Sequence, residues 1–506
     1  MSLFENYILL GIIVKQSVKG TIYVYLGVLL GFVTTAILFP RIYSPAEVGL
    51  LKIIVAYSTL IAQFGTLGIN GATIRLFPFF RTEDKKHHGF LPFALTIGMA
   101  GFLISAILLL IFKPLLIEMS LEKSTLLVEY VNYLIVLVFF QLFFSILDIY
   151  YSALMNSVHG TWLREVFQRI VIILMIGLYY FDLLSFHQFV VTYIAAISFP
   201  TIYILFTLIK EGHFTLQFDF AFLDKRLLRS IGAVSLFSIL NGFSVIMIQN
   251  VDLLMVNKML GLDAAGIYAI CFFFGVVVSL PARSIYKIAN VTAAEAWKKD
   301  DRKTLRDIYE KSCLTLFIIG SFLFLGVWLN IDNIMEILRP EYLSGKWVIF
   351  FIGLGCLLDM ATGANSSLMG TSKYYKVQSY LLLVLVVVLV ALNLVLIPLY
   401  GLTGAAISSA AALGILNLLR FLFLWFKYDL QPYNLRFIYV ILIGIVSFVI
   451  AYAIPAKFHY IIDILIRSTV FSLLFLLPVY FFRISTDLNN AADNVLKKLK
   501  IIREKV

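Results

Sequence analysis

The chain has 506 residues, of which 61% are hydrophobic and only 14% are charged, and its mean hydropathy is +0.97. This composition excludes a soluble protein, because a soluble domain needs a charged shell that so few charged residues cannot form. The net charge of +11 does not indicate nucleic-acid binding, since the basic residues lie between apolar runs, where they orient membrane helices and contact anionic lipids. The sequence therefore predicts an all-α polytopic membrane protein.

Apolar runs long enough to cross a membrane recur along the chain. A membrane helix needs roughly 20 apolar residues, because an unpaired backbone amide in hydrocarbon costs several kcal/mol. The clearest runs are, in chain order, Gly20–Pro40, Ile53–Ile74, Gly89–Phe112, Leu183–Ile209, Ser230–Val251, Ala264–Ala282, Ser312–Ile331 and Phe437–Pro455. The uncharged stretch 377–419 is too long for one span, and Pro398 and Gly401 divide it into two.

Weaker apolar runs contain charged residues and complete the set of predicted spans. They are Leu126–Ala153, Leu163–Phe181, Trp347–Met369 and Tyr460–Phe482. The total is about fourteen membrane helices, an even number that places both termini on the same side. Most of the 40 Lys and Arg residues, including Arg164 and Arg169, fall on that side. The positive-inside rule therefore predicts that both termini are cytoplasmic.

An internal repeat organises the predicted helices. A shift of 217 residues (266 minus 49) places Gly49 on Gly266 and Arg41 on Lys258, both in outer turns. This offset corresponds to six spans, and an even number of helices per repeat makes the two copies parallel. The predicted domains are a six-helix lobe at 1–212, a six-helix lobe at 213–428, two additional helices at 429–483 and a cytoplasmic amphipathic tail at 484–506. The two lobes are expected to enclose a central cavity.

Three stretches of the chain resemble a known family. The first contains Lys19-Gly, Gly27-Val-Leu-Leu-Gly-Phe and Phe39-Pro-Arg-Ile-Tyr-Ser-Pro-Ala-Glu-Val-Gly49-Leu. The second runs from Val251 to Tyr268, and the third is Ile397-Pro-Leu-Tyr-Gly-Leu-Thr-Gly-Ala-Ala406. Together they resemble the oligosaccharide flippases of the polysaccharide transporter family, within the multidrug/oligosaccharidyl-lipid/polysaccharide exporter superfamily.

The resemblance implies a transport function. It implies alternating access, in which oligosaccharide linked to undecaprenyl diphosphate is flipped from the inner to the outer leaflet of the bacterial cytoplasmic (inner) membrane. Such transport serves the biosynthesis of cell-surface polysaccharide such as the O-antigen of lipopolysaccharide. The implied partners are the lipid-linked oligosaccharide, membrane lipids, and a polysaccharide polymerase or chain-length protein. The resemblance does not identify the sugar.

Two predicted spans carry polar stripes. On the second span, Lys52, Thr59, Gln63, Thr66 and Asn70 fall within about 60° of one another on a helix. On the seventh, Ser238, Asn241, Gln249 and Asp252 fall within about 80°. Because a polar stripe facing lipid is costly, each stripe faces either a water-filled cavity or hydrogen-bonding partners on neighbouring helices.

An anionic diphosphate also needs basic groups. Lys52 lies at the outer mouth of the second span, whereas Lys19 and Arg283 lie near cytoplasmic helix ends. Snorkelling is the alternative explanation for Lys52, and topology anchoring for the other two. The predicted substrate-binding set is Lys19, Lys52, Thr59, Gln63, Asn70, Asn241, Gln249, Asp252 and Arg283.

Two acidic residues lie inside predicted spans. Asp148 and Asp359 either form a coupling site for Na⁺ or H⁺ or pair with a nearby base. No catalytic residue, metal site or further cofactor is predicted. All six histidines lie in or near loops, without the paired pattern that a membrane glycosyltransferase or polymerase needs, so an enzyme is disfavoured.

Two transporter classes compete with the oligosaccharide flippase. One is an ion-coupled exporter of drugs or other small molecules from the same superfamily, whose cavity should favour acids over Lys and Arg. The other is a lipid II flippase, although the arginine-rich opening pattern of those relatives is missing here.

Overall fold

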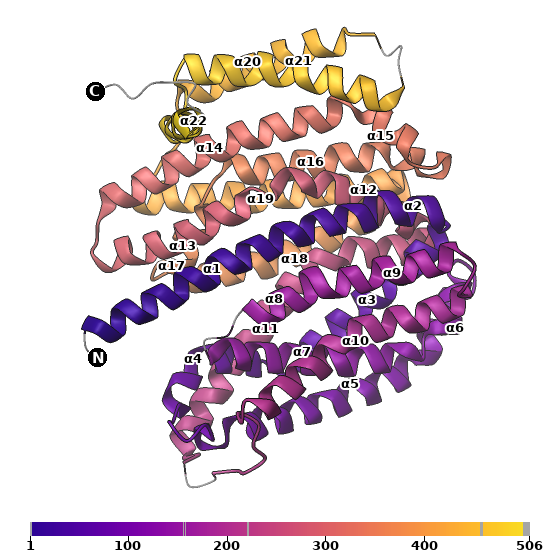
Figure 1. Ribbon diagram of the computed structural model, residues 1–506, viewed down its shortest axis with the longest axis vertical. Coiled ribbons are helices and arrows are strands. Elements are labelled where there is room, and N and C mark those ends of the chain that lie inside the picture. The colour runs from indigo at the N-terminus through magenta and orange to yellow at the C-terminus, as the bar shows by residue number, and fades with distance from the viewer. Residues whose placement is uncertain (1–2, 155, 157, 220–221, 456–458, 499–506) are drawn as a thin grey trace. The chain divides into compact units, whose positions relative to one another are not determined.

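The computed structural model describes residues 3–498, except 155, 157, 220–221 and 456–458. Within these residues the regular structure is entirely helical (Figure 1). Thirteen of the described helices are long and apolar enough to cross a membrane. The prediction of an all-α polytopic membrane protein is therefore confirmed. Of the predicted tail, α22 covers Thr486–Lys498, and residues 499–506 lie outside the described residues.

The chain divides into two compact units, Met1–Gly266 and Ile267–Val506. The helices of the first unit are α1 (Leu3–Phe32), η1 (Val33–Leu38), α2 (Phe39–Ile42), α3 (Pro45–Gly65), α4 (Ile69–Phe80), η2 (His87–Gly89), α5 (Phe90–Ser120), α6 (Thr125–Tyr130), α7 (Tyr133–Ala153), α8 (Val158–Trp162), η3 (Leu163–Phe167), α9 (Gln168–Tyr180), α10 (Phe186–Lys210), α11 (Lys225–Leu260) and the start of α12 (Leu262–Val276). Those of the second are the rest of α12, η4 (Val277–Ser279), α13 (Ala282–Lys298), α14 (Arg302–Leu329), α15 (Ile331–Ile337), η5 (Pro340–Gly345), α16 (Lys346–Ala361), α17 (Asn365–Thr371), α18 (Tyr375–Tyr400), α19 (Leu402–Tyr428), α20 (Leu435–Tyr452), α21 (Tyr460–Phe481) and α22.

Helix α11 packs within the first unit. The repeat assigns this helix to the second lobe, yet it lies against α3 and α4. The lobe boundaries derived from the repeat stay a prediction, since they concern internal similarity rather than packing.

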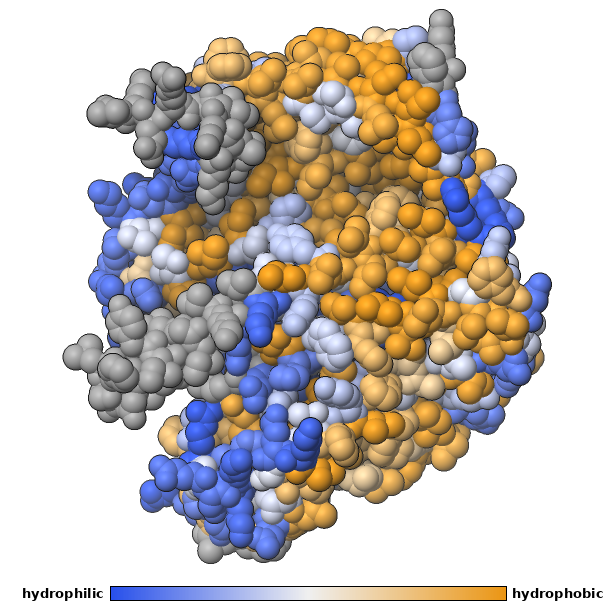
Figure 2. All heavy atoms as spheres, in the orientation of Figure 1, coloured by the Kyte–Doolittle hydropathy of each residue, from blue (hydrophilic) through white to orange (hydrophobic). Residues whose placement is uncertain are grey.

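The lipid-facing surface is apolar, as the composition requires. Large side chains such as Leu442, Ile445 and Val449 on α20 are exposed. Figure 2 shows that apolar side chains cover the α20–α21 hairpin, whereas hydrophilic ones gather near the end of α4. Exposed aliphatic residues on a helix of this length are stable in lipid and would be costly in water.

The predicted fifth span is not a regular helix. Its residues form α8, η3 and α9 in succession, and η3 is a π-helix of 5 residues at Leu163–Phe167. The three pieces together cover 158–180, about one membrane crossing. The run contains the three charged residues Arg164, Glu165 and Arg169, which is why it is not among the thirteen apolar spans.

The predicted second span is interrupted. Between α3 and α4, Leu67 and Gly68 have φ angles of 47° and 74°. Gly68 is required there, because a Cβ atom at this position would overlap the backbone of Ser235 in α11. The expectation that Lys52 and Asn70 share one helical wheel is therefore wrong, since the break rotates α4 relative to α3.

The boundary between two later helices lies where the sequence predicts it. The boundary predicted at Pro398 and Gly401 is confirmed, because α18 ends at Tyr400 and α19 begins at Leu402. Gly401 has a φ of 58°, which glycine adopts at little cost.

The two glycines related by the repeat contact each other within the first unit. A Cβ atom on Gly49 would overlap the Leu262 carbonyl oxygen, and one on Gly266 would overlap the Pro45 carbonyl oxygen. Pro45 and Leu262 are themselves separated by the offset of 217 residues (262 minus 45). The start of α3 and the start of α12 thus cross with the two-fold symmetry that the repeat requires.

Candidate functional site

An ion pair lies near the middle of the helical run formed by α8, η3 and α9, the predicted fifth span. The Arg169 guanidinium is 2.9 Å from the Glu165 carboxylate, and about a third of each side chain is exposed (32% and 30%). The two residues are one helical turn apart, so the pair forms within one face of the helix. Charges at this depth are costly unless they are paired or hydrated, and they usually mark functional sites in membrane proteins.

Two glycines of α1 make room for this ion pair. A Cβ atom on Gly27 would lie 2.7 Å from the Glu165 Cβ, and one on Gly31 would overlap the Arg169 guanidinium. Both glycines belong to the opening motif of the chain. The physical role of the motif is therefore to leave space beside α1 for the ion pair. The π-helix η1 follows directly after α1, so the two helices that hold the pair both contain π turns, which are frequent at functional sites.

Lys52 of α3 faces the same region. Its ammonium nitrogen is 5.3 Å from the centroid of the Phe39 ring, a cation–π distance. Arg169 is near enough to repel the Lys52 ammonium electrostatically. Two basic groups from different helices therefore lie close together inside the membrane region. A bound anion would offset the repulsion between their charges.

A second pair of opposite charges lies nearby. The Arg164 side chain is exposed, and its guanidinium carbon is 4.0 Å from the centroid of the Phe144 ring. Asp148 of α7 attracts Arg164 and lies against Gly160, where a Cβ atom would overlap the carboxylate. These residues of the first unit form one charged cluster, composed of Lys52, Asp148, Arg164, Glu165 and Arg169.

The polar stripe of the second span is largely used in helix packing. Thr59 donates a hydrogen bond to Gln141 of α7 (2.7 Å), and the Asn70 amide donates to Ser145 of α7 (2.7 Å). The Gln63 amide lies against Gly242 of α11. Of the two arrangements left open by the sequence, hydrogen bonding between helices describes Thr59 and Asn70.

The polar stripe of α11 is arranged differently. Asn241 and Gln249 are exposed, and Val245 lies between them on the same face at helical spacing. Asp252, at the end of the stripe, is only 4% exposed and has interaction partners. Exposed amides in the middle of a spanning helix are costly in lipid, so this face favours a hydrated space.

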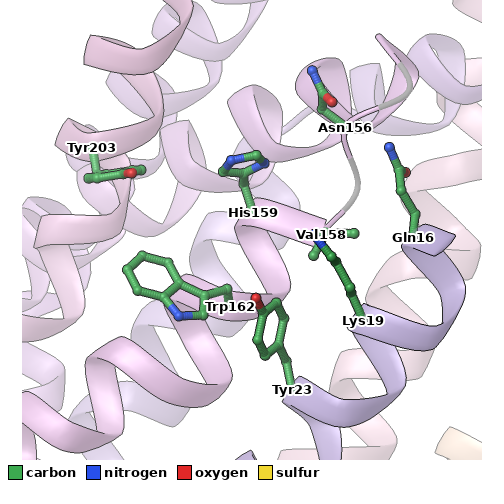
Figure 3. A pocket seen from close by; sticks show the side chains of 8 residues that line it. All are labelled: Gln16, Lys19, Tyr23, Asn156, Val158, His159, Trp162 and Tyr203. Atoms are coloured by element: carbon green, nitrogen blue, oxygen red, sulfur yellow. The ribbon is translucent and has the colours of Figure 1, made fainter. Parts of the chain in front are cut away.

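The two predicted cytoplasmic bases are exposed. Lys19 of α1 lines a pocket together with residues of α8 and α10, also in the first unit (Figure 3). Arg283 is exposed on α13 in the second unit. Neither the substrate-binding set nor the acidic pair is tested by these positions, and both stay predictions.

Asp359 has partners in the second unit that the sequence did not reveal. Its carboxylate accepts hydrogen bonds from the Asn417 amide (2.9 Å) and the Tyr286 hydroxyl (3.2 Å). Asn417 is buried and also accepts hydrogen bonds from Asn365 and Arg420. The network joins α13, α16, α17 and α19. Its hydrogen bonds fix the alignment of these four helices more specifically than apolar packing alone would.

The fold and the charged cluster define a class of protein. A polytopic helical membrane protein with charges held inside one helical unit is typical of transporters. More specifically, the chain belongs to the polysaccharide biosynthesis protein family, whose model matches residues 15–288, more than half of the sequence.

One curated relative and two solved structures are also similar to the chain. The chain is 20% identical over 431 residues to the uncharacterized membrane protein MJ1068 of Methanocaldococcus jannaschii, covering 82% of this chain and 84% of that one. Its fold matches the lipid II flippase MurJ in an inward closed conformation, with a TM-score of 0.72 at 15% identity over 93% of this chain and 99% of that one. It also matches a multidrug resistance MATE family transporter of the MOP superfamily, with a TM-score of 0.61 at 13% identity over 80% and 94% of the two chains.

Proposed function

We propose that this protein flips undecaprenyl-diphosphate-linked oligosaccharide from the inner to the outer leaflet of the cytoplasmic membrane by alternating access. Both termini are then cytoplasmic, and the product serves cell-surface polysaccharide synthesis of the O-antigen type. The observation that carries the proposal is the charged cluster, in which Lys52, Arg164 and Arg169 come from two membrane-crossing segments of one unit. Family membership supports the same function.

The cargo chemistry matches this arrangement. A diphosphate needs basic groups at membrane depth, and guanidinium groups bind phosphate oxygens in a bidentate manner. The glycan needs hydrated hydrogen-bonding groups, which the exposed amides of Asn241 and Gln249 offer. Three basic residues against two acidic ones in the cluster favour an anionic cargo over the cationic drugs expected of an acidic cavity.

The membrane potential favours export of such a cargo. Each elementary charge that crosses gains about 2.3 kcal/mol per 100 mV, so a diphosphate carrying about two negative charges gains about 5 kcal/mol on moving outward. A coupling ion can add to this gain. Asp148 and Asp359 remain the proposed positions for Na⁺ or H⁺, although the two hydrogen bonds to Asp359 leave it fewer free lone pairs.

A lipid II flippase is the second candidate. The shared fold with MurJ favours it. Both cargoes carry a diphosphate, so the charged cluster does not distinguish them. Complementation distinguishes the two candidates. Rescue of surface glycan in a strain lacking its oligosaccharide flippase supports the first, and rescue of peptidoglycan synthesis in a strain lacking its lipid II flippase supports the second.

Replacing Lys52 by alanine tests the cluster. A hydrogen bond to a charged group contributes about 1.5–3 kcal/mol, so we expect the Lys52→Ala variant to display at least about tenfold less surface glycan. Lys52→Arg should retain most of the display, because it keeps the charge. The measurement is glycan staining of complemented cells at equal membrane abundance of the protein. Normal display by Lys52→Ala would remove Lys52 from the site.

A further inference from the structure

A pocket of about 470 Å³ opens between α1, α8 and α10. Figure 3 shows the side chains of Tyr23, His159 and Trp162 in the middle of its lining, with Tyr203 on one side and Lys19 on the other. The amide side chains of Gln16 and Asn156 complete its polar edge. All of these residues belong to the first unit, and the predicted orientation places the pocket at the cytoplasmic end of the first candidate span, which begins at Lys19.

Five of the polar side chains around this pocket are not used by the fold. Across the described part of the chain, the Lys19 ammonium, the Trp162 indole N–H and the Tyr203 hydroxyl make no hydrogen bond or ion pair with protein. The same holds for the Tyr23 hydroxyl and the His159 ring. The Trp162 and Tyr203 rings lie with centroids 6.2 Å apart at 54°, so they form two walls that meet at an angle. A pocket in which hydrogen-bond donors without protein partners converge beside aromatic rings is typical of a small-molecule site.

The lining selects among the ligands available at a membrane surface. The faces of pyranose rings carry C–H groups that stack on aromatic rings, while their hydroxyl groups accept and donate hydrogen bonds at the ring edge. Trp162 and the two tyrosines offer both kinds of contact, and Lys19 offers a partner for a phosphate. A phosphatidylglycerol or phosphatidylethanolamine headgroup would use Lys19 but has no ring to place against Trp162. A glycosyl phosphate uses all of these groups.

The pocket and the charged cluster are consecutive along one helical run. Trp162 ends α8, and Arg164 and Glu165 follow directly in η3. Arg169 is seven residues beyond Trp162, about 10 Å along the helix axis at 1.5 Å per residue. A headgroup held at the pocket would therefore have its phosphates within a short step of the cluster.

We propose that this pocket is a loading site that binds the first sugar and adjoining phosphate of the lipid-linked cargo before the headgroup enters the charged cluster. This inference rests on the proposed flippase function and adds a separate cytoplasmic binding step. Trp162 and Tyr203 hold the sugar ring, and Lys19 holds the phosphate.

The experiment measures equilibrium binding to the full-length protein in detergent. The probes are glucose 1-phosphate and N-acetylglucosamine 1-phosphate, with inorganic phosphate and phosphatidylglycerol micelles as comparators. We expect at least one sugar phosphate to bind at least tenfold more tightly than inorganic phosphate. Trp162→Leu should weaken that binding at least tenfold, and Lys19→Gln should lower the sugar phosphate to the affinity of the free sugar.

Matched controls separate the site from general damage. Trp347→Leu removes another half-exposed tryptophan, outside the pocket, and Lys225→Gln removes another exposed cytoplasmic lysine of the first unit; both should bind as the wild type does. Equal binding of inorganic phosphate and sugar phosphates, tighter binding of phosphatidylglycerol, or unchanged binding by Trp162→Leu would overturn the inference. Transport by the wild type in the complementation assay would survive any of these results, so failure of the loading site and failure of the flippase function are distinguishable.

Discussion

The Gly266→Val variant should abolish surface glycan display while the protein remains in the membrane. Gly266 and Gly49 form the point at which the starts of α3 and α12 cross, and backbone atoms fill the space that a side chain would need. The Gly49 nitrogen is only 3.0 Å from a Cβ atom built on Gly266. Because the neighbouring atoms are backbone rather than side-chain ends, neither helix can yield locally, and the crossing must open.

The predicted orientation gives this opening a functional consequence. The crossing lies at the outer ends of both helices, so in alternating access it seals the side opposite to the cytoplasmic entrance. A side chain there holds the outer end apart and prevents the return to an inward-open state. The symmetry of the contact predicts that Gly49→Val has the same effect, and that either alanine variant has a smaller one.

Gly177→Val is the matched control for this prediction. Gly177 also lies in a membrane-crossing helix, α9, but nothing lies within 4 Å of a Cβ atom built on it. Display should therefore be normal in this variant. The measurement is glycan display against protein abundance in isolated membranes. Normal display by Gly266→Val at normal abundance would show that the crossing does not have to close.

Much of the fold could be predicted because hydrophobic length dominates in a membrane. Helices such as α18 and α19 follow directly from apolar run length, with Pro398 and Gly401 at the boundary. The break at Leu67 and Gly68 could not be predicted in this way. Nothing in local hydropathy distinguishes a glycine that accommodates Ser235 of another helix from one in a continuous helix.

The candidate site was harder to predict than the fold. Lys52 stands out in the sequence because it lies at the outer mouth of the second span, in line with a polar stripe, whereas Arg164 and Arg169 count only toward the cytoplasmic side. Counting basic residues by side gives no contacts for a residue that lies within a span, so it did not bring Arg164 and Arg169 together with Lys52. The signal that could have found the pair was Glu165 four residues before Arg169, since paired charges at helical spacing inside an apolar segment are costly unless they are used.

The ion pair leads to the second large prediction, in which the two partners behave differently. If Arg169 binds the diphosphate during crossing, Arg169→Gln removes the guanidinium and should lower the flipping rate at least about a hundredfold, as the loss of about 3 kcal/mol implies. Glu165→Gln keeps the guanidinium and removes the carboxylate that competes with the cargo for it. We expect this variant to bind the diphosphate headgroup at least as tightly as the wild type.

The difference between the two variants separates a role of Arg169 in transport from a purely structural role of the ion pair. A structural ion pair needs both partners, so its loss would impair Arg169→Gln and Glu165→Gln equally, and the double variant would be no worse than either. A cargo-binding arginine instead makes the double variant resemble Arg169→Gln alone. The measurement is flipping of a fluorescent lipid-linked diphosphate sugar in proteoliposomes, together with its binding affinity in detergent. Equal loss in both single variants, with unchanged headgroup affinity, would assign the pair to stability and leave Lys52 and Arg164 as the remaining basic groups of the cluster.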